Sequence, residues 1–443
     1  MLKKTGYLVM CALLVSACGG GSNTGGGPRE SVLFGAREMP EGDKVLWRTD
    51  GTAAGTGRVR ADQIAMPAAP RFPHMVSMNG LHYFAATRSF GTSLLWVSDG
   101  TEAGTQPLES ALYPGPVSPG SFTRLDDVIY FNASGGVGVQ DLWRTDGTPE
   151  GTYRLDNLLP LSDVAPHPSS MVVLGGQLFM VVYTGLNQRG VIRLSAGEET
   201  ATLLREVDRQ GFTQMVAFRE RLLVAESVGG VSHLWSIAPD TGDAVSLLEL
   251  PMNGTFRAIS SLRVMGDHVY FLGTDADYGE ELWVSDGTVS GTRLHTDMTP
   301  GIAGTQFYQL YSADNVLLIV AAADAGAGVW AVENVGAPAR VILDLPLAEL
   351  ISNILGTYQD SLYFHRPRDA GGQLCAVTVS APGLRCLEAP VTPVPTYSVL
   401  PLNNDLLFVG RSEGTGVELW RTRPALSGAE LIMDICPGDC AAF

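Results

Sequence analysis

The sequence has 443 residues, of which 45% are apolar and 17% charged, with a net charge of −17. This composition excludes general disorder, and the length suffices for a large buried core or several domains. An acidic surface repels phosphate backbones and anionic lipid headgroups. Composition therefore disfavours nucleic acid as a partner and peripheral binding to anionic lipid headgroups.

The amino terminus has the pattern of a bacterial lipoprotein leader. Two lysines precede an apolar run over residues 7–15 that is too short to span a bilayer, and Val15-Ser16-Ala17-Cys18 follows. These four residues resemble a lipobox, which implies a signal peptide over 1–17 and acylation of Cys18. A conventional signal peptide cut near Ala17, with Cys18 incidental, is the alternative.

A glycine-rich tether follows the leader, over residues 18–30, and contains GGGSNTGGG from Gly19. Such a sequence is a flexible coil that holds a folded body away from the membrane. No later segment has eighteen uninterrupted apolar residues, so we expect membrane contact through the lipid anchor alone. Gly19 stands where an aspartate would favour inner-membrane retention, and the expected location is the outer membrane of the cell envelope.

The rest of the chain, residues 31–443, is a tandem repeat. It reads LWRTDGTAAGT from Leu46, LWVSDGTEAGT from Leu95, LWRTDGTPEGT from Leu142 and LWVSDGTVSGT from Leu282. Arg193 and Cys375 occupy the tryptophan position in two further units, so nine units result, spaced 42 to 50 residues apart. All the tryptophans of the chain follow this spacing: Trp47, Trp96, Trp143, Trp235, Trp283, Trp330 and Trp420.

Each unit predicts four short strands. A two-residue turn signal such as Asn79-Gly80 joins the first two strands, and a β-branched or aromatic run forms the second. The tryptophan lies on the third strand, and DGTxxGT forms the turn to the fourth. In that turn an aspartate caps backbone N–H groups and a glycine takes positive φ. The expected capping residues are Asp50, Asp99, Asp146 and Asp286.

Units of this size and strand count predict an all-β fold, a β-propeller of four-stranded blades. Leu95 and Val97 face one side of their strand and Trp96 the other, as a strand between two neighbouring sheets requires. Nine blades is the direct count and eight the alternative. Since little but the tether precedes the first unit, either its blade has three strands or the tail, residues 437–443, supplies the edge.

The motif LW[RV][ST]DGTxxGT resembles the ELWxxDGT repeat of exported proteins of myxobacteria and similar bacteria. The end of that pattern also occurs here, as Asp297-Met298-Thr299-Pro300-Gly301 and, with a cysteine inserted, from Asp434. Four units match the motif, and the other five keep its spacing without DGT. The resemblance implies a propeller-like fold and no established activity.

Four cysteines remain outside the leader, and export favours disulfides between them. Three pairings are possible. We favour Cys375–Cys386 and Cys436–Cys440, because the repeat places Cys375 on a third strand and Cys386 on the fourth strand beside it. A zinc site is disfavoured, since the spacings contain no close CxxC pair and no nearby histidine.

The repeated aspartates and tryptophans have a functional interpretation, as metal ligands or sugar contacts, and a structural one, as turn caps and packing between blades. Repetition in many units favours the structural one. Asp275 and Asp277 resemble the start of a calcium loop, but glycine holds the third ligand position, so we expect no cofactor and keep calcium as a weak candidate.

No GxSxG, HExxH, SxxK or P-loop motif occurs, and the histidines are scattered. The sequence therefore favours a non-enzymatic envelope module that binds or scaffolds a protein or glycan partner. Two alternatives stay open: a propeller enzyme that acts on extracellular polysaccharide or peptide, and an outer-membrane assembly scaffold.

Overall fold

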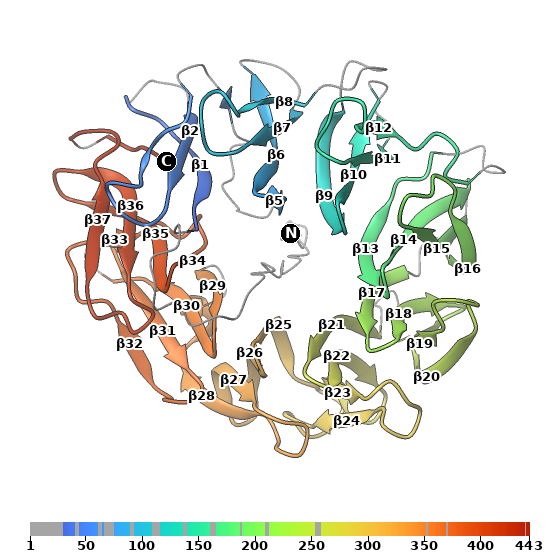
Figure 1. Cartoon of the computed structure of the whole chain (residues 1–443). Helices are drawn as coiled ribbons and strands as arrows, with labels where there is room; N and C mark the ends of the chain where they lie inside the picture. The colour runs from blue at the N-terminus through green and yellow to red at the C-terminus, as the bar shows by residue number, and fades with distance from the viewer. Residues whose placement is uncertain are drawn as a thin grey trace, which may run out of the picture.

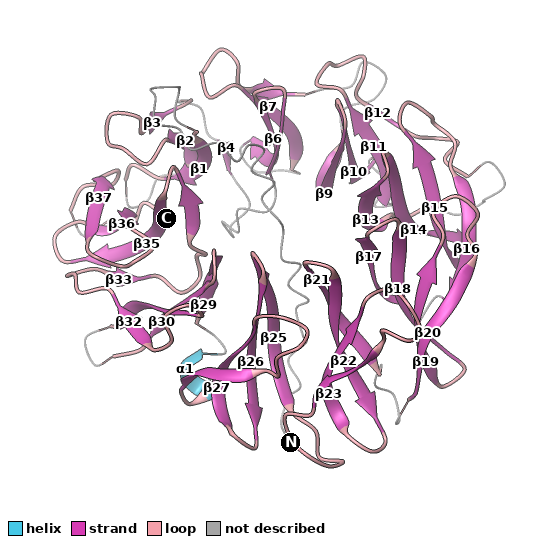
Figure 2. Cartoon of the chain, turned by 60° about the horizontal axis from the view of Figure 1, so that its bottom comes forward, coloured by secondary structure: helices cyan, strands magenta, loops and turns pink. Residues whose placement is uncertain are grey.

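The computed structural model describes residues 30–39, 44–60, 64–65, 75–88, 93–108, 116–135, 140–159, 165–186, 188–208, 212–252, 258–350, 353–368, 371–438 and 440–443. Antiparallel sheets are arranged around a common centre (Figure 1). The short helix α1 (Leu347–Leu350) is the one helix in these ranges (Figure 2). The predicted all-β, propeller-like fold is confirmed. Cys18, the leader and all of the tether but residue 30 lie outside the described residues. Nowhere in the described ranges is a helix long and apolar enough to cross a membrane.

Five sheets have the four strands expected of a unit, in chain order from the centre outward. Their strands are β13 (Ser169–Leu174), β14 (Gln177–Gly185), β15 (Gln188–Ser195) and β16 (Thr202–Asp208); β17 (Phe212–Phe218), β18 (Arg221–Val228), β19 (Val231–Ile237) and β20 (Ala244–Pro251); β21 (Ile259–Met265), β22 (His268–Asp275), β23 (Gly279–Ser285) and β24 (Arg293–Thr296); β25 (Gln306–Ala313), β26 (Val316–Ala323), β27 (Gly326–Val332) and β28 (Arg340–Asp344); and β29 (Ile354–Tyr358), β30 (Ser361–Arg366), β31 (Gln373–Thr378) and β32 (Leu384–Cys386).

The first three units and the last depart from this pattern. Among the described residues, the first unit has a three-stranded sheet. The second and third units join into one sheet through a single pair, Leu94 with Val117. In the last unit the innermost strand is split in two. The strands are β1 (Val32–Ala36), β2 (Val45–Thr49) and β3 (Gly57–Arg58); β4 (Ile64–Ala65), β5 (Met75–Met78), β6 (Leu81–Arg88), β7 (Leu94–Ser98), β8 (Gln106–Pro107), β9 (Val117–Leu125), β10 (Val128–Ser134), β11 (Gln140–Thr145) and β12 (Tyr153–Arg154); and β33 (Thr392–Pro393), β34 (Leu400–Leu402), β35 (Asp405–Ser412), β36 (Gly416–Thr422) and β37 (Ala429–Met433).

Each tryptophan occupies the same register position. It lies opposite a large apolar residue of the second strand, as Trp96 lies opposite Phe84 and Trp330 opposite Ile319. Arg193 and Cys375 take this position opposite phenylalanines in their own units. Six tryptophans are buried, whereas Trp235 is only half-buried. The repeat therefore maps onto strand register throughout the chain.

Apolar side chains pack between neighbouring sheets rather than in one central core. One buried cluster, for example, combines Tyr83 and Leu95 of the second unit with Phe131 and Trp143 of the third. Nine such clusters occur among the described residues, and each spans two units. One of them joins Trp47 of the first unit to the last unit, which lies beside it (Figure 1).

Tight turns join the first and second strands where the sequence predicts them. Asn79 and Gly80 have φ values of 54° and 78°, and Asn403 and Asn404 have 50° and 68°. Positive φ at both central residues defines the type I′ turn, whose twist matches that of the flanking strands.

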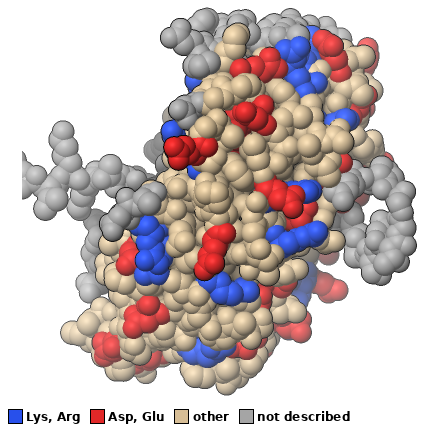
Figure 3. All heavy atoms as spheres, turned by 90° about the vertical axis from the view of Figure 1, so that its left-hand side faces the viewer, with Lys and Arg blue, Asp and Glu red and all other residues tan. Residues whose placement is uncertain are grey.

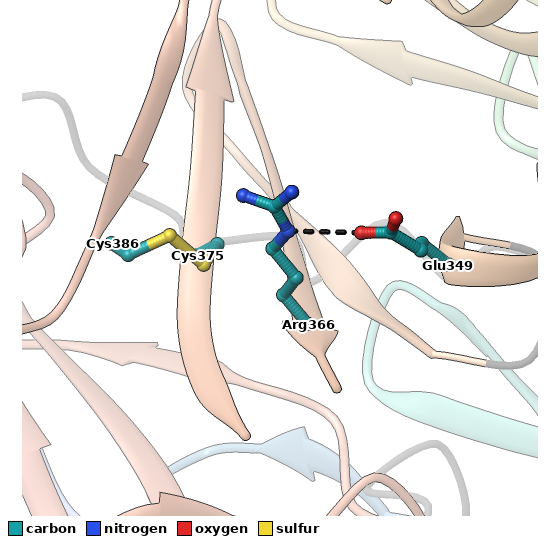
Figure 4. The surroundings of a disulfide bond; sticks show 4 residues. All are labelled: Glu349, Arg366, Cys375 and Cys386. Carbon is teal, nitrogen blue, oxygen red and sulfur yellow. Dashed lines mark hydrogen bonds and ion pairs between the residues drawn. A yellow bond between two sulfur atoms is a disulfide. The ribbon is translucent and has the colours of Figure 1, made fainter. Parts of the chain in front are cut away.

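Both predicted disulfides are present. Cys375 of β31 lies opposite Cys386 of β32 and is bonded to it, and Cys436 is bonded to Cys440. Figure 4 shows the first of these beside an ion pair in which Arg366 of β30 reaches Glu349 of α1 at 2.9 Å.

Candidate functional site

The DGTxxGT turn is closed by hydrogen bonds within itself. Asp99 Oδ1 accepts from the backbone N–H of Thr101 at 2.8 Å and from its hydroxyl at 2.7 Å. The Thr101 hydroxyl oxygen accepts from the N–H of Gly104, and the Thr105 hydroxyl donates to the Thr101 carbonyl. The same set of bonds recurs around Asp50, Asp146 and Asp286.

The second glycine of the motif is required for steric reasons. A Cβ atom at Gly104 would lie 2.1 Å from Cγ of Asp99, so only glycine fits beside the capping carboxylate. The hydrogen bonds from Thr101 hold the pKa of Asp99 below its usual value. These aspartates are therefore engaged with their own turns, and their carboxylates do not converge on a shared ligand site.

We expect Asp99→Ala to lower the free energy of unfolding by about 1 kcal/mol, because the Thr101 N–H and hydroxyl lose their acceptor at a partly solvated site. Denaturant unfolding of the two proteins measures this difference. The control is Asp127→Ala, since Asp127 is exposed and lies 4.0 Å from Arg124. Equal stability of both variants would contradict the capping role.

The calcium candidates do not gather a ligand set. Asp275 Oδ1 accepts from the N–H of Asp277 at 2.8 Å, so this carboxylate closes its own loop. Among the residues that the structure describes, no group of three or more histidine, cysteine, aspartate or glutamate side chains is placed to hold a metal ion.

Two buried glutamates were missed in the sequence. Glu281 accepts from the N–H groups of Met298 and Thr299 and from the Thr305 hydroxyl. Glu418 accepts from the N–H groups of Ile435 and Cys436 at 3.1 and 3.0 Å. Burial raises the pKa of Glu418 to about 7, against the opposing effect of those two N–H groups. The sequence pattern that could have identified both residues is a glutamate directly before the Leu-Trp pair of the repeat.

The surroundings of Trp235 differ from those of the other tryptophans. The Arg205 guanidinium lies 4.4 Å from the centre of its indole ring, and the His233 ring stacks at 4.9 Å. Arg205 also reaches the buried Glu226 at 3.5 Å, and His233 Nδ1 lies 3.4 Å from Glu249. Glu226 thus pairs with Arg205, and Glu249 lies beside His233. Because Arg205 belongs to the fourth unit and both Trp235 and Glu226 to the fifth, these contacts indicate packing between the two units.

A charged pocket of about 230 Å³ lies on the last unit. Figure 3 shows the side of the molecule on which this unit lies, where acidic and basic side chains alternate. The start of β35, the end of β36, the turn after it and the start of β37 form the pocket. Its lining residues are Asp405, Arg421, Thr422, Arg423, Ser427, Gly428, Ala429 and Glu430.

Two arginines and two carboxylates dominate this pocket. Asp405, 6% exposed, lies 3.2 Å from Arg423 and 3.8 Å from Arg421. Arg421 also binds Glu430 at 2.6 Å and donates to the carbonyl of Gly51 in the first unit at 3.0 Å. The Arg423 side chain stays 65% exposed although it pairs with Asp405.

None of these four residues was among the predicted site residues. The available signal was a departure from the repeat: Arg423 stands three residues after Trp420, where four units have the capping aspartate. The other four units have Ala196, Ala238, Glu333 and Thr378 at that position, so a basic residue occurs there once. In the last unit, the side chain at this position therefore pairs with Asp405 of another strand instead of capping its own turn.

No family model and no curated protein matches the sequence. Similar solved structures include a puromycin hydrolase, with 13% identity and a TM-score of 0.42 over 84% of this chain and 54% of that one. Prolyl oligopeptidase B from Galerina marginata has 11% identity and a TM-score of 0.43 over 76% and 55%. A puromycin-hydrolyzing peptidase of Mycobacterium tuberculosis has 14% identity and 0.43 over 83% and 53%.

This chain thus spans about half the length of the proteins it resembles in fold. All three are hydrolytic enzymes by name, which contradicts two of our expectations: the non-enzymatic binding or scaffold module, and the preference for no enzyme activity over an enzyme, a question that the sequence left open. Both were wrong. They relied on the lack of linear motifs, and such motifs do not reveal a site assembled from separate strands.

Proposed function

We propose that this chain is a propeller enzyme that hydrolyses extracellular peptide, with the charged pocket of the last unit as its substrate site. The observation that carries the proposal is the largely exposed side chain of Arg423, paired at 3.2 Å with the buried carboxylate of Asp405. A guanidinium fork binds a substrate carboxylate in a bidentate way, which fixes the substrate's orientation.

The two carboxylates of the pocket are its candidate proton-transfer groups. Asp405 is enclosed, whereas the side chain of Glu430 is 69% exposed at the rim. A carboxylate that reaches the substrate can accept a proton from an attacking water as a general base. Arg421, which contacts both, holds their relative position and donates no proton itself.

Peptide is favoured over polysaccharide by the chemistry of the lining. A peptide offers both a carboxylate for Arg423 and amide or amine donors for the acidic groups. None of the described residues that line the pocket is aromatic, whereas a neutral sugar ring would need an apolar face to pack against.

We propose that the propeller closes as a ring of nine blades, the first with three strands. Nine buried clusters support this count, since each fills one space between two units and one of them joins the first unit to the last.

We further propose membership of the ELWxxDGT repeat group, attachment to the outer membrane through acylated Cys18, and no nucleic-acid partner. The leader sequence, the two disulfides and the net charge of −17 support an exported, acidic protein.

We expect the purified full chain, kept in detergent, to hydrolyse members of a panel of short peptides with free carboxylates. Arg423→Ala should raise KM about tenfold or more, because the substrate carboxylate loses a charge-assisted hydrogen bond. Liquid chromatography of the products gives both kinetic constants.

The matched control is Arg340→Ala, since Arg340 lies 2.5 Å from Glu333 in an exposed Arg–Glu pair far from this pocket in sequence. Turnover of polysaccharides but not of peptides would refute the peptide assignment. Peptide turnover that Arg423→Ala and Glu430→Gln leave unchanged would refute the pocket.

A further inference from the structure

The last residues of the chain pair with β36, the second-last strand. After β37 the chain forms a small loop closed by the Cys436–Cys440 disulfide. The N–H of Val417, at the start of β36, donates to the carbonyl of Cys440, and the N–H of Ala442 donates to the carbonyl of Val417, both at 2.9 Å. Ala441 and Val417 thereby form a parallel bridge.

The same residues also contact the first unit. The N–H of Arg37 donates to the carbonyl of Ala442 at 2.8 Å. The Phe443 ring stacks on Phe34 of β1 at 5.7 Å and meets the edge of Tyr397 at 5.9 Å. Residues 440–443 therefore lie between the first and last sheets, where Figure 1 places the carboxyl terminus.

This tail belongs to the buried core of the seam between those two sheets. Ala442 is fully buried, and Cys436 and Phe443 are also buried, in the cluster that contains Trp47 and Leu419. Sequence-adjacent units are joined by the chain itself, but the first and last units are hundreds of residues apart. Non-covalent contacts alone must hold this seam, so it is the place where the ring opens most readily.

We infer that the Cys436–Cys440 disulfide is a latch, which holds residues 440–443 across the seam while oxidised and releases them when reduced. This inference rests on the proposed ring closure and is independent of the proposed activity. A dithiol supplies the two electrons. One of its thiolates attacks Sγ of one cysteine, which breaks the S–S bond, releases the other cysteine as a thiolate and forms a mixed disulfide. The second dithiol sulfur then attacks the dithiol sulfur of the mixed disulfide and releases the attacked cysteine, and both cysteine thiolates take up the protons that the dithiol lost. Two cysteine thiols and an oxidised dithiol result. Without the cross-link the loop regains conformational freedom, and the tail exchanges its buried position for solvent more often.

The other disulfide provides a matched control. Cys375–Cys386 connects two strands of one sheet, so its loss leaves the seam contacts in place. The test is amide hydrogen exchange of the full chain, oxidised and dithiol-treated, and of the variants Cys436→Ser/Cys440→Ser and Cys375→Ser/Cys386→Ser.

Reduction and the Cys436→Ser/Cys440→Ser variant should each speed exchange about tenfold in peptides that cover β1, the start of β36 and residues 440–443. Exchange in β23, far from the seam, should not change. The Cys375→Ser/Cys386→Ser variant should alter exchange only around β31 and β32.

Unchanged exchange at the seam after reduction, or equal acceleration in all sheets, would overturn the latch. If the double-serine variant does not fold, dithiol treatment of the folded wild type gives the same comparison. Phe443→Ala, which keeps the disulfide, should open the seam in the same place and to a smaller extent.

Discussion

We expect Trp143→Ala to lower the free energy of unfolding by about 3–5 kcal/mol, the range found when a large buried aromatic side chain is truncated. The indole is fully buried among Tyr83, Leu95 and Phe131, so it fills the space between the second and third units. Its removal leaves a cavity that rigid neighbouring sheets cannot close.

Denaturant unfolding, followed by fluorescence and by circular dichroism, measures this loss. Trp235→Ala is the matched control, because this indole is half-buried and partly covered by Arg205. Its truncation should cost about 1–2 kcal/mol. A small effect for Trp143→Ala, or equal effects of the two substitutions, would show that the repeated tryptophans do not carry the packing between units.

The second large effect concerns pH. Burial raises the pKa of Glu418 from 4.5 to about 7, so between these values the folded protein keeps a proton that the unfolded chain has released. The unfolding free energy therefore falls as pH rises through this window and levels off above about 7. The whole contribution is about 3 kcal/mol, from about 1.4 kcal/mol per pKa unit.

Glu418→Gln should flatten this part of the stability profile, because glutamine resembles the protonated acid and does not ionise. Unfolding free energies of both proteins at intervals from pH 4 to pH 8 give the comparison. Glu430→Gln is the control, since its side chain is largely exposed. Parallel profiles for the wild type and Glu418→Gln would mean that the two N–H groups keep Glu418 ionised throughout.

Much of the fold was predictable because contacts between residues close in the sequence define the strands and turns of each unit. A tryptophan at a fixed position sets the register of its strand, and Asn79-Gly80 sets a type I′ turn. Asp99 and Gly104 close the next turn by contacts within seven residues. The Cys375–Cys386 pairing followed from the same register.

The pocket was not predictable in this way, since its geometry depends on a neighbour distant in sequence. Arg421 is oriented by the carbonyl of Gly51, 370 residues earlier, and Asp405 joins through a different strand. Glu418 likewise gains its partners from the loop after β37. The expectation of a non-enzymatic module was wrong for the same reason: it relied on motifs of residues close in the sequence, and such motifs do not reveal side chains brought together from different strands.

Local interactions are thus encoded in the sequence of one unit at a time, which is why the sequence by itself determined the strands, the turns, the register and the Cys375–Cys386 pairing. Only the tertiary structure decided three features that involve the last unit: a tail buried between it and the first unit, a glutamate whose partners lie in the loop after β37, and a charged pocket. The physical reason is that side chains hundreds of residues apart acquire defined distances only after every intervening sheet has packed.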